Sequence, residues 1–312
     1  MNLLQLRVLR EVVRQDFSLT EAAQVLHSSQ SALSKQIREL ETELGLALFV
    51  RKGKRFTGLT EAGEQVLPML ERLLLEAGNI ARVAEHFRET DAGQLCIATT
   101  HTQARYVLPE IVVAFRREFP KVQLSLQQGS PKQIVDWLLR GQAQIGIATE
   151  SLAQHEELVT FPYYQWTHAV VVPADHPLLR APLDIESLSR WPLITYHSGF
   201  TGRQRIEEGF MRCAKKPNIV MSALDADVIK TYVACGLGVG IIASMAFDPI
   251  RDQGLRKIEA GQLFGPNVTV MAFRRGQILK RYAFRFAQLC SQTLSPDALR
   301  LQVESTQPTR PA

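Results

Sequence analysis

The stretch Ser18–Gly45, SLTEAAQVLHSSQSALSKQIRELETELG, constrains the fold of this chain more than any other. Ser18, with Glu21 three residues later, has the form of a capping box and opens a two-turn helix. A turn at 27–29 leads into a second helix over about 30–44, which Gly45 ends as a C-terminal cap. Two short helices joined by a tight turn are typical of a helix-turn-helix unit, and an amphipathic helix expected at the N-terminus can pack behind them.

The second helix of this pair has a face suited to DNA. Its apolar stripe is expected to be buried, while the opposite face begins with short hydrogen-bonding groups and continues with two cations. In a recognition helix the N-terminal residues meet base edges and the cations meet phosphates. A solvated amphipathic helix has the same pattern, so the context has to decide. The expected buried stripe is Ala32, Leu33, Ile37, Leu40 and Leu44. The candidate DNA-binding residues here are Ser29, Gln30, Ser31, Ser34, Lys35 and Arg38.

A basic hairpin is expected directly after this helix, in LFVRKGKRFTGLT at residues 48–60. Gly53 can adopt the positive φ that such a turn requires. A wing of this kind can reach phosphates or the minor groove beside a recognition helix. A solvated charged hairpin is the alternative, but the position after a candidate recognition helix favours the wing. Its four cations, Arg51, Lys52, Lys54 and Arg55, complete the candidate DNA-binding set.

A long helix is expected from Thr60 to about Phe87. Its apolar residues are separated alternately by four and three residues, which is a heptad seam. A second copy of the chain is the simplest partner for that seam, and packing against the chain's own core is the less favoured alternative. Pro68 removes one backbone hydrogen bond and is expected to kink the helix. The seam consists of Val66, Leu70, Leu73, Ala77, Ile80, Ala84 and Phe87.

Strand and helix signals alternate after a polar break at residues 89–93. This alternation predicts α/β units with a parallel sheet. The chain is expected to form two α/β lobes, to cross between them and to return, as in a hinged binding protein. The overall class is α/β. The expected domains are a winged helix-turn-helix domain at 1–59, a linker helix at 60–90, an effector-binding domain at 91–295 and a flexible tail at 296–312. Within the effector-binding domain, lobe I covers 91–162 and 267–295, and lobe II covers 163–266.

Three polar strand-to-helix junctions are expected to meet in the cleft between the lobes, at 99–103, at Thr149 and at 199–203. Ligands of such folds bind at the carboxyl ends of strands. Hydroxyl groups and the free N–H groups of a helix N-terminus together suit a compact anion. Helix capping is the competing role for each threonine. No Lys or Arg is unambiguously central to the cleft.

The remaining sequence excludes several functions. His101 lies beside threonines, but no Ser/His/Asp or Cys/His set, paired carboxylates or metal-ligand cluster can be assembled, so we expect no enzyme, cofactor or metal. The four cysteines form no close pair, and reduced cytosolic thiols are expected. The N-terminal residues lack the long uncharged run of a signal peptide, and no apolar run reaches membrane-spanning length, so a cytoplasmic protein without a membrane partner is expected. The formal net charge of +5 permits nucleic-acid binding.

The segment LTEAAQVLHSSQSALSKQIRELETELGLALFVR, with LTEAG after the wing, resembles the LysR-type transcriptional regulators, and the likeness extends from residue 1 to about 290. Within that family, KGKRFTGLTEAG, TTHTQARYVLP and GFTGR resemble the CysB/Cbl branch, which controls sulfur assimilation. Pro68 departs from that branch. The alternatives are a LysR-type regulator that senses an aromatic or organic acid and, in another class, a solute-binding protein. The latter lacks a DNA-binding head and requires a signal peptide.

The resemblance implies a specific mode of action. It implies an activator of sulfur-acquisition genes that binds double-stranded promoter DNA as a homo-oligomer, a dimer through the linker helix and usually a tetramer. RNA polymerase is the further partner expected of an activator. It also implies a small anionic effector: sulfate, thiosulfate, an acetylated serine or adenylyl sulfate. The residues implied to hold a sulfate-like anion are Thr100, Thr102, Gln103, Thr149 and Thr201.

Overall fold

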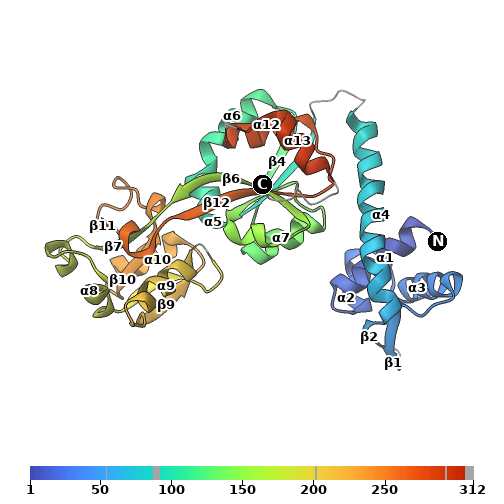
Figure 1. Cartoon of the computed structure of the whole chain (residues 1–312), viewed down its shortest axis with the longest axis horizontal. Coiled ribbons are helices and arrows are strands. Elements are labelled where there is room, and N and C mark those ends of the chain that lie inside the picture. The colour runs from blue at the N-terminus through green and yellow to red at the C-terminus, as the bar shows by residue number, and fades with distance from the viewer. Residues whose placement is uncertain (54, 87–91, 201, 292–293, 306–312) are drawn as a thin grey trace. The chain divides into compact units, whose positions relative to one another are not determined.

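The computed structural model divides into two compact units, Met1–Arg88 and Glu89–Ala312 (Figure 1). The structure describes residues 1–53, 55–86, 92–200, 202–291 and 294–305, and within these not the side chains of 82, 84–86, 150 and 151. No helix in this described part is long and apolar enough to span a bilayer.

The first unit is a winged helix-turn-helix, as predicted. The turn between the two helices contains His27 at a φ of 48°, and Gly45 ends the second helix at a φ of 67°. The predicted stripe is wrong at its margins, because Ala32 and Leu44 are exposed while Leu33, Ile37 and Leu40 are buried. The elements are α1 (Leu3–Arg14), α2 (Leu19–Val25), α3 (Gln30–Leu44), the antiparallel strands β1 (Phe49–Lys52) and β2 (Arg55–Leu59), and α4 (Glu61–His86).

Helix α4 contradicts part of the predicted heptad seam. Leu70 is buried in the core of the first unit, where Leu74 joins it and Val66 packs against it. The first turns of α4 therefore pack against the chain's own core. This was the alternative that the spacing disfavoured, and it is correct for this part of the helix. Pro68 lies within α4, which continues through it (Figure 1). Phe87 and the side chain of Ala84 lie outside the described residues. The exposed apolar residues of α4 are Met69, Leu73, Ile80 and Val83.

Lobe I of the second unit contains a mixed five-stranded sheet in the order β4-β3-β5-β12-β6. The parallel arrangement predicted from the sequence holds for β4, β3 and β5, but β12 is antiparallel to both β5 and β6. Helices α6, α12 and α13 cover one face of the sheet and α7 covers the other (Figure 1). The strands are β3 (Gly93–Thr99), β4 (Val122–Gln128), β5 (Ile145–Thr149), β6 (Leu158–Trp166) and β12 (Asn267–Arg274). The helices are α5 (His101–Tyr106), α6 (Leu108–Glu118), α7 (Pro131–Leu139), α12 (Arg281–Cys290) and α13 (Pro296–Glu304).

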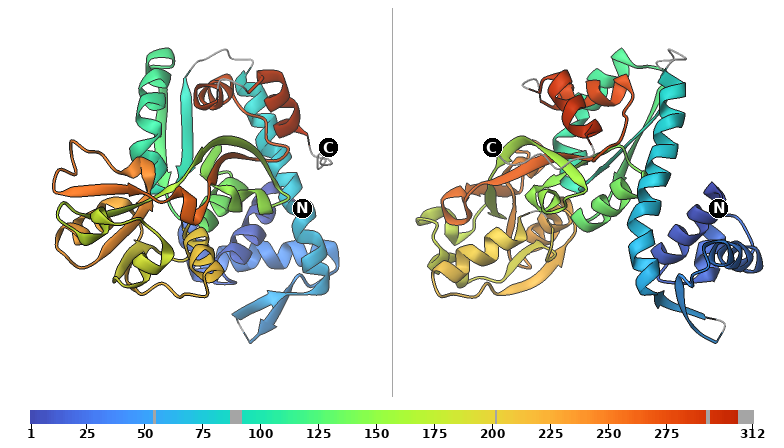
Figure 2. Two further views of the ribbon diagram at one scale, coloured as in Figure 1. Left: turned by 60° about the vertical axis from the view of Figure 1, so that its left-hand side comes forward. Right: turned by 45° about the vertical axis from the view of Figure 1, so that its right-hand side comes forward.

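Lobe II has a second five-stranded sheet, in the order β11-β7-β10-β8-β9. Its core packs α8, α9 and α11 on one face of the sheet and α10 on the other. The paired strands β6 and β12 carry the chain between the lobes (Figure 2). The strands are β7 (His168–Pro173), β8 (Leu193–Tyr196), β9 (Ile219–Ala223), β10 (Val239–Ala243) and β11 (Leu255–Glu259). The helices are α8 (Ile185–Ser189), α9 (Arg203–Arg212), α10 (Ala226–Ala234) and α11 (Gly261–Phe264).

Two predicted boundaries of the second unit need correction. The expected lobe boundary at 162/163 falls inside β6, so the chain enters lobe II at Thr167 instead. The tail predicted as flexible from residue 296 begins with α13, because Leu299 and Val303 are fully buried in the core of lobe I. The prediction failed because the segment is mostly polar, and its two apolar residues at helical spacing, Leu299 and Val303, were not recognised as a buried face. Residues 306–312 lie outside the described part.

Candidate DNA interface and anion site

The N-terminus of α3 is organised by hydroxyl groups. The Ser29 side chain accepts a hydrogen bond of 3.2 Å from the backbone N–H of Ala32, which caps the helix. Its oxygen lies 3.0 Å from the hydroxyl oxygen of Ser31. Gln30 donates a hydrogen bond of 2.8 Å to the Thr20 hydroxyl, which ties the start of α3 to α2. Of the base-reading candidates Gln30, Ser31 and Ser34, the first two are exposed and Ser34 is partly buried.

The cations of α3 are only weakly engaged by their own helix. Lys35 lies 3.8 Å from Glu39, and its side chain is 74% exposed. Arg38 is exposed and is 3.5 Å from the hydroxyl of Ser34. Exposed ion pairs of this kind contribute little, since solvent screens them. Lys35 and Arg38 can therefore exchange these partners for phosphate oxygens.

The wing is fixed to α3 by an acidic residue that the sequence did not single out. The Glu41 carboxylate accepts hydrogen bonds from the backbone N–H groups of Leu48 (2.9 Å) and Phe49 (3.2 Å), and it also pairs with Arg51. The Arg51 guanidinium lies 4.8 Å from the centroid of the Phe56 ring. Arg51 is thus held within the unit rather than presented freely. Glu41 is one of three alternating acids, with Glu39 and Glu43, so the sequence did not distinguish it.

The other wing cations differ from Arg51. Lys52 and Arg55 are exposed, and Lys54 lies outside the described residues. A hollow beside the wing joins Arg55 to Gln30 and to the start of α2 at Ser18–Thr20. The structure therefore brings Gln30 and Arg55, which are 25 residues apart in the sequence, to one surface.

In the second unit, the candidate anion residues gather at the start of α5. Thr100 precedes the helix and is buried, but its side chain makes no capping hydrogen bond, so helix capping does not explain it. Thr102 is only 1% exposed, and its hydroxyl oxygen has no hydrogen-bond partner in the described part of the chain. Burial raises the pKa of Tyr196 in lobe II, and the Ala243 N–H and the nearby Thr102 hydroxyl oppose that increase, although the Thr102 and Tyr196 hydroxyl groups do not form a hydrogen bond of normal geometry. Thr102 therefore lies beside lobe II.

Gln103 is anchored to the strands that connect the lobes. Its amide nitrogen donates to the Thr269 hydroxyl on β12 (3.3 Å), and its amide oxygen accepts from the Tyr164 hydroxyl on β6 (2.6 Å). Burial raises the pKa of Tyr164, although the Thr269 and Gln103 side chains oppose the increase. These two partners were missed from the sequence because they lie 61 and 166 residues from Gln103.

Thr149 lies at the same sheet edge as Thr100, because β3 and β5 are parallel neighbours. It lines a pocket of about 290 Å³ that also contains residues of lobe II. Of the three junctions predicted to meet, Thr149 and the described residues of 199–203 therefore come together, while residues 99–103 do not line this pocket and Thr201 lies outside the described residues. The pocket is lined by Thr149, Gln154, Gly199, Phe200, Gly202, Arg203, Gln204, Arg205 and Glu208.

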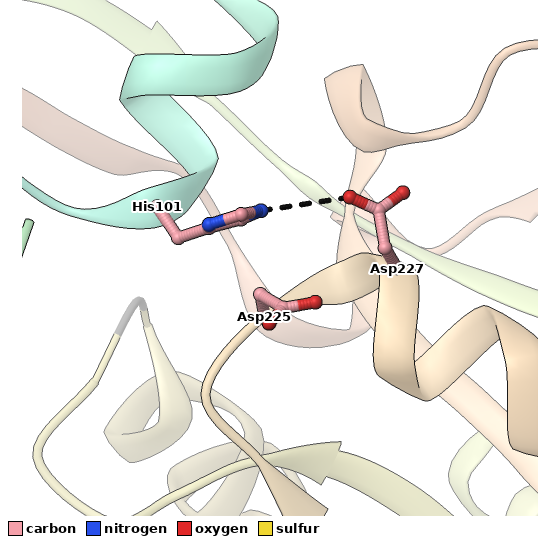
Figure 3. A group of neighbouring side chains, drawn as sticks. All are labelled: His101, Asp225 and Asp227. Atoms are coloured by element: carbon pink, nitrogen blue, oxygen red, sulfur yellow. Dashed lines mark ion pairs between the residues drawn. The ribbon is translucent and has the colours of Figure 1, made fainter.

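A group with the composition of a metal site lies beside the start of α5: His101, Asp225 and Asp227 (Figure 3). Nε2 of His101 is 3.5 Å from Oδ2 of Asp227, and Asp225 caps α10 by accepting from the N–H of Val228 (2.9 Å). Local sequence could not show this group, because His101 is more than 120 residues from the two aspartates. A metal would have to displace groups that already hold Asp227.

Those groups balance the Asp227 charge. Arg105 contacts its carboxylate at 2.6 Å, the Tyr106 hydroxyl donates to it at 2.6 Å, and Lys230 lies 3.4 Å away. Burial alone would raise the pKa of Asp227, but the Tyr106 hydrogen bond and the charges of Lys230 and Arg105 lower it below its ordinary value. The carboxylate therefore stays ionised at neutral pH, and the arrangement serves as an ion-pair network between the lobes.

Comparison with known proteins places both units in one family. The description "Bacterial regulatory helix-turn-helix protein, lysR family" matches residues 3–64, and "LysR substrate binding domain" matches residues 88–295. The chain is 49% identical over 296 residues to the transcriptional regulator SsuR of Burkholderia cenocepacia (95% of this chain, 96% of the relative). It is 50% identical over 310 residues to CysB of the same organism (98% and 99%) and 48% identical over 304 residues to cbl of Escherichia coli (97% and 96%).

Solved structures agree with this assignment. The cofactor-binding domain of the Cbl transcriptional regulator is 47% identical, with a TM-score of 0.66 over 69% of this chain and 95% of that chain. Full-length CbnR, solved with its target DNA, is 20% identical, with a TM-score of 0.58 over 94% of this chain and 100% of that chain. The second likeness supports the fold alone.

Proposed function

The chain belongs to the LysR family of bacterial regulatory helix-turn-helix proteins, and we propose that it activates sulfur-acquisition genes in response to a small anion. As a member of this family it is a DNA-binding transcriptional regulator and not an enzyme. Its target genes would serve sulfur assimilation, cysteine biosynthesis or sulfonate use. Identities of 48–50% over nearly the whole chain to SsuR, cbl and CysB support this assignment. The regulator would act in the cytoplasm, together with RNA polymerase at its promoters.

Promoter binding would use the exposed end of α3 and the wing. Gln30, Ser31 and Ser34 are suited to base edges, because they are short hydrogen-bonding groups on the N-terminal part of the helix. Lys35, Arg38 and Arg55 are exposed cations suited to phosphates. Ser29 has a capping role that would orient its neighbours. Lys54 belongs to the proposed set by its place in the wing sequence.

Two copies of this unit would be joined through α4. The exposed residues Met69, Leu73, Ile80 and Val83 have spacings that place them on one side of the helix, as a partner helix requires. Leu70 cannot serve this purpose, since it is buried in its own unit. A dimer would place two recognition helices on two half-sites, and a tetramer would pair two such dimers.

The anion would bind at the start of α5. The observation that carries this proposal is the Thr102 hydroxyl, which is buried without a hydrogen-bond partner among the described residues. An unsatisfied buried hydroxyl costs free energy unless a ligand or water completes it. Thr100 and Gln103 lie on either side of Thr102 in the sequence at the start of α5, and Thr149 ends the neighbouring strand β5 at the same sheet edge. Thr201 completes the proposed set. A sulfate-like group, whose oxygens all accept hydrogen bonds, fits such a site.

Effector control would be a shift between two arrangements of the lobes. An anion that prefers one arrangement changes its population, and the spacing of DNA-binding units would change with it. The effector is proposed to be sulfate, thiosulfate, an acetylated serine or adenylyl sulfate.

Calorimetry tests the effector class. The full-length protein would be titrated with sulfate, thiosulfate and O-acetylserine, and with benzoate for comparison. Binding of a sulfur-pathway compound is expected, whereas binding of benzoate alone would overturn the sulfur proposal.

Fluorescence anisotropy with a labelled promoter fragment of a sulfonate-use gene, against a scrambled fragment, tests DNA recognition. Equal affinity for both fragments would contradict sequence-specific binding there.

A further inference from the structure

Helix α5 faces two sites at once. Thr100, Thr102 and Gln103 lie at its start and form the proposed anion site. His101, Arg105 and Tyr106, on the same helix, contact Asp227 of lobe II. Because α5 has only six residues, a displacement of its backbone moves both sets of side chains together.

Three lobe II contacts of α5 converge on one carboxylate. Arg105 and the Tyr106 hydroxyl each lie 2.6 Å from an oxygen of Asp227, and His101 Nε2 lies 3.5 Å away. The Tyr106 ring also packs against the core of lobe II. Asp227 is on the first turn of α10, so this carboxylate joins a lobe I helix to a lobe II helix.

Within lobe II, the buried Lys230 holds the groups around Asp227 in place. Lys230 is only 6% exposed; its Nζ donates to the Tyr106 hydroxyl (3.2 Å), to the Ala246 carbonyl (2.8 Å) and to Asp252 (3.0 Å). The Tyr106 hydroxyl therefore lies between a buried cation and the Asp227 carboxylate. A buried network is stable when every member is paired and costly when one partner withdraws. Such a network favours one docked position of α5 over intermediate positions.

We infer that Asp227 is the positioning residue through which occupancy of the anion site on α5 is transmitted to lobe II. This inference rests on the proposed anion site, which Asp227 itself does not touch. A ligand that displaces or rotates α5 changes all three contacts together, since they lie on the same two turns. The network thereby converts a local change at Thr100–Gln103 into a change in how lobe II is held.

Hydrogen exchange of the full-length unliganded protein tests the contact first. In Asp227→Asn, the backbone amides of α5 are expected to exchange roughly fivefold faster or more, because their anchor in the other lobe is weakened. Tyr106→Phe removes the bridging hydroxyl and is expected to act in the same direction. Glu186→Gln is the matched control, because Glu186 pairs with Lys215 at 2.7 Å wholly within lobe II. Unchanged exchange of α5 in both Asp227→Asn and Tyr106→Phe would overturn the inference.

Sulfate then tests transmission. In the wild type, saturating sulfate is expected to slow exchange in α5 and also in α10 across the cleft. In Asp227→Asn it should slow exchange in α5 only, and persistent slowing in α10 would overturn the inference. The effects of Asp227→Asn and Tyr106→Phe on sulfate affinity should also be non-additive. If calorimetry detects no sulfate binding to the wild type, the anion proposal fails, while the unliganded comparison still decides whether Asp227 joins the lobes.

Discussion

The two binding regions of this protein hold their polar groups in opposite ways. On the winged unit the described candidate residues other than Ser34 are exposed, and the Lys35 side chain is 74% accessible. At the start of α5, Thr100, Thr102 and Gln103 are 1–3% exposed. DNA is a long polyanion that mobile cations bind through counterion release. A small anion instead loses its water, so fixed dipoles must replace that water. The difference indicates which substitutions should act through charge and which through geometry.

The largest effect is expected from removing the exposed cations. The triple change Lys35→Ala, Arg38→Ala and Arg55→Ala should weaken promoter binding about a hundredfold or more. It should also reduce the salt slope, which is the slope of the logarithm of the binding constant against the logarithm of the salt concentration, by about three, because each lost phosphate contact reduces this slope by about one. Fluorescence anisotropy at several salt concentrations measures both quantities. The control Arg117→Ala, Lys121→Ala and Lys132→Ala removes the same charge from lobe I. An equal loss in the control would mean that total charge, not this surface, determines binding.

A glycine pair tests geometry in the cleft. A Cβ on Gly202 would lie 2.6 Å from the Asn267 side-chain oxygen and 2.7 Å from Cε1 of His168, at a φ of +67°. Gly199 has a φ of +81°, but a Cβ added there would meet no described atom within 4 Å. Gly202→Ala should therefore lower the free energy of unfolding by about 2–3 kcal/mol, against about 1 kcal/mol for Gly199→Ala. Thermal unfolding measures the difference, and equal losses would show that the cleft wall yields to an added methyl group.

The same contrast explains what the sequence could predict. Capping residues and apolar periodicity predicted α3 from Gln30 to Leu44 with Gly45 as its cap, because both signals depend only on residues close together in the sequence. The ends of β3 and β5 could be placed together because parallel strands share an edge. The Tyr164 and Thr269 contacts to Gln103 depend on pairing between distant strands, which no local pattern encodes. The seam on α4 was wrong at Leu70 because periodicity identifies an apolar face but not what covers it.

The unpaired hydroxyl of the anion site allows stability and binding to be separated. Thr102→Val should lower sulfate affinity about tenfold, yet leave the unliganded protein as stable or about 1 kcal/mol more stable, since it removes an unsatisfied buried group. Thr195→Val is the control, because the equally buried Thr195 donates to the Ile241 carbonyl at 2.8 Å. That change should cost about 1–2 kcal/mol of stability without changing sulfate affinity. A destabilised Thr102→Val protein with normal sulfate affinity would make Thr102 structural rather than ligand-binding.

The smallest expected effect separates two neighbouring cations of the wing. Lys52 is exposed and forms no ion pair with any residue that the structure describes, whereas Arg51 is paired with Glu41 and stacked on Phe56. Lys52→Ala should therefore weaken promoter binding about three- to fivefold and reduce the salt slope by about one, with unchanged stability. Arg51→Ala removes a charge that Glu41 already balances, so its salt slope should change less and its melting temperature should fall slightly. If the two variants lost equal slope, Glu41 would have to release Arg51 on the DNA, and the wing would be an adjustable element rather than a fixed one.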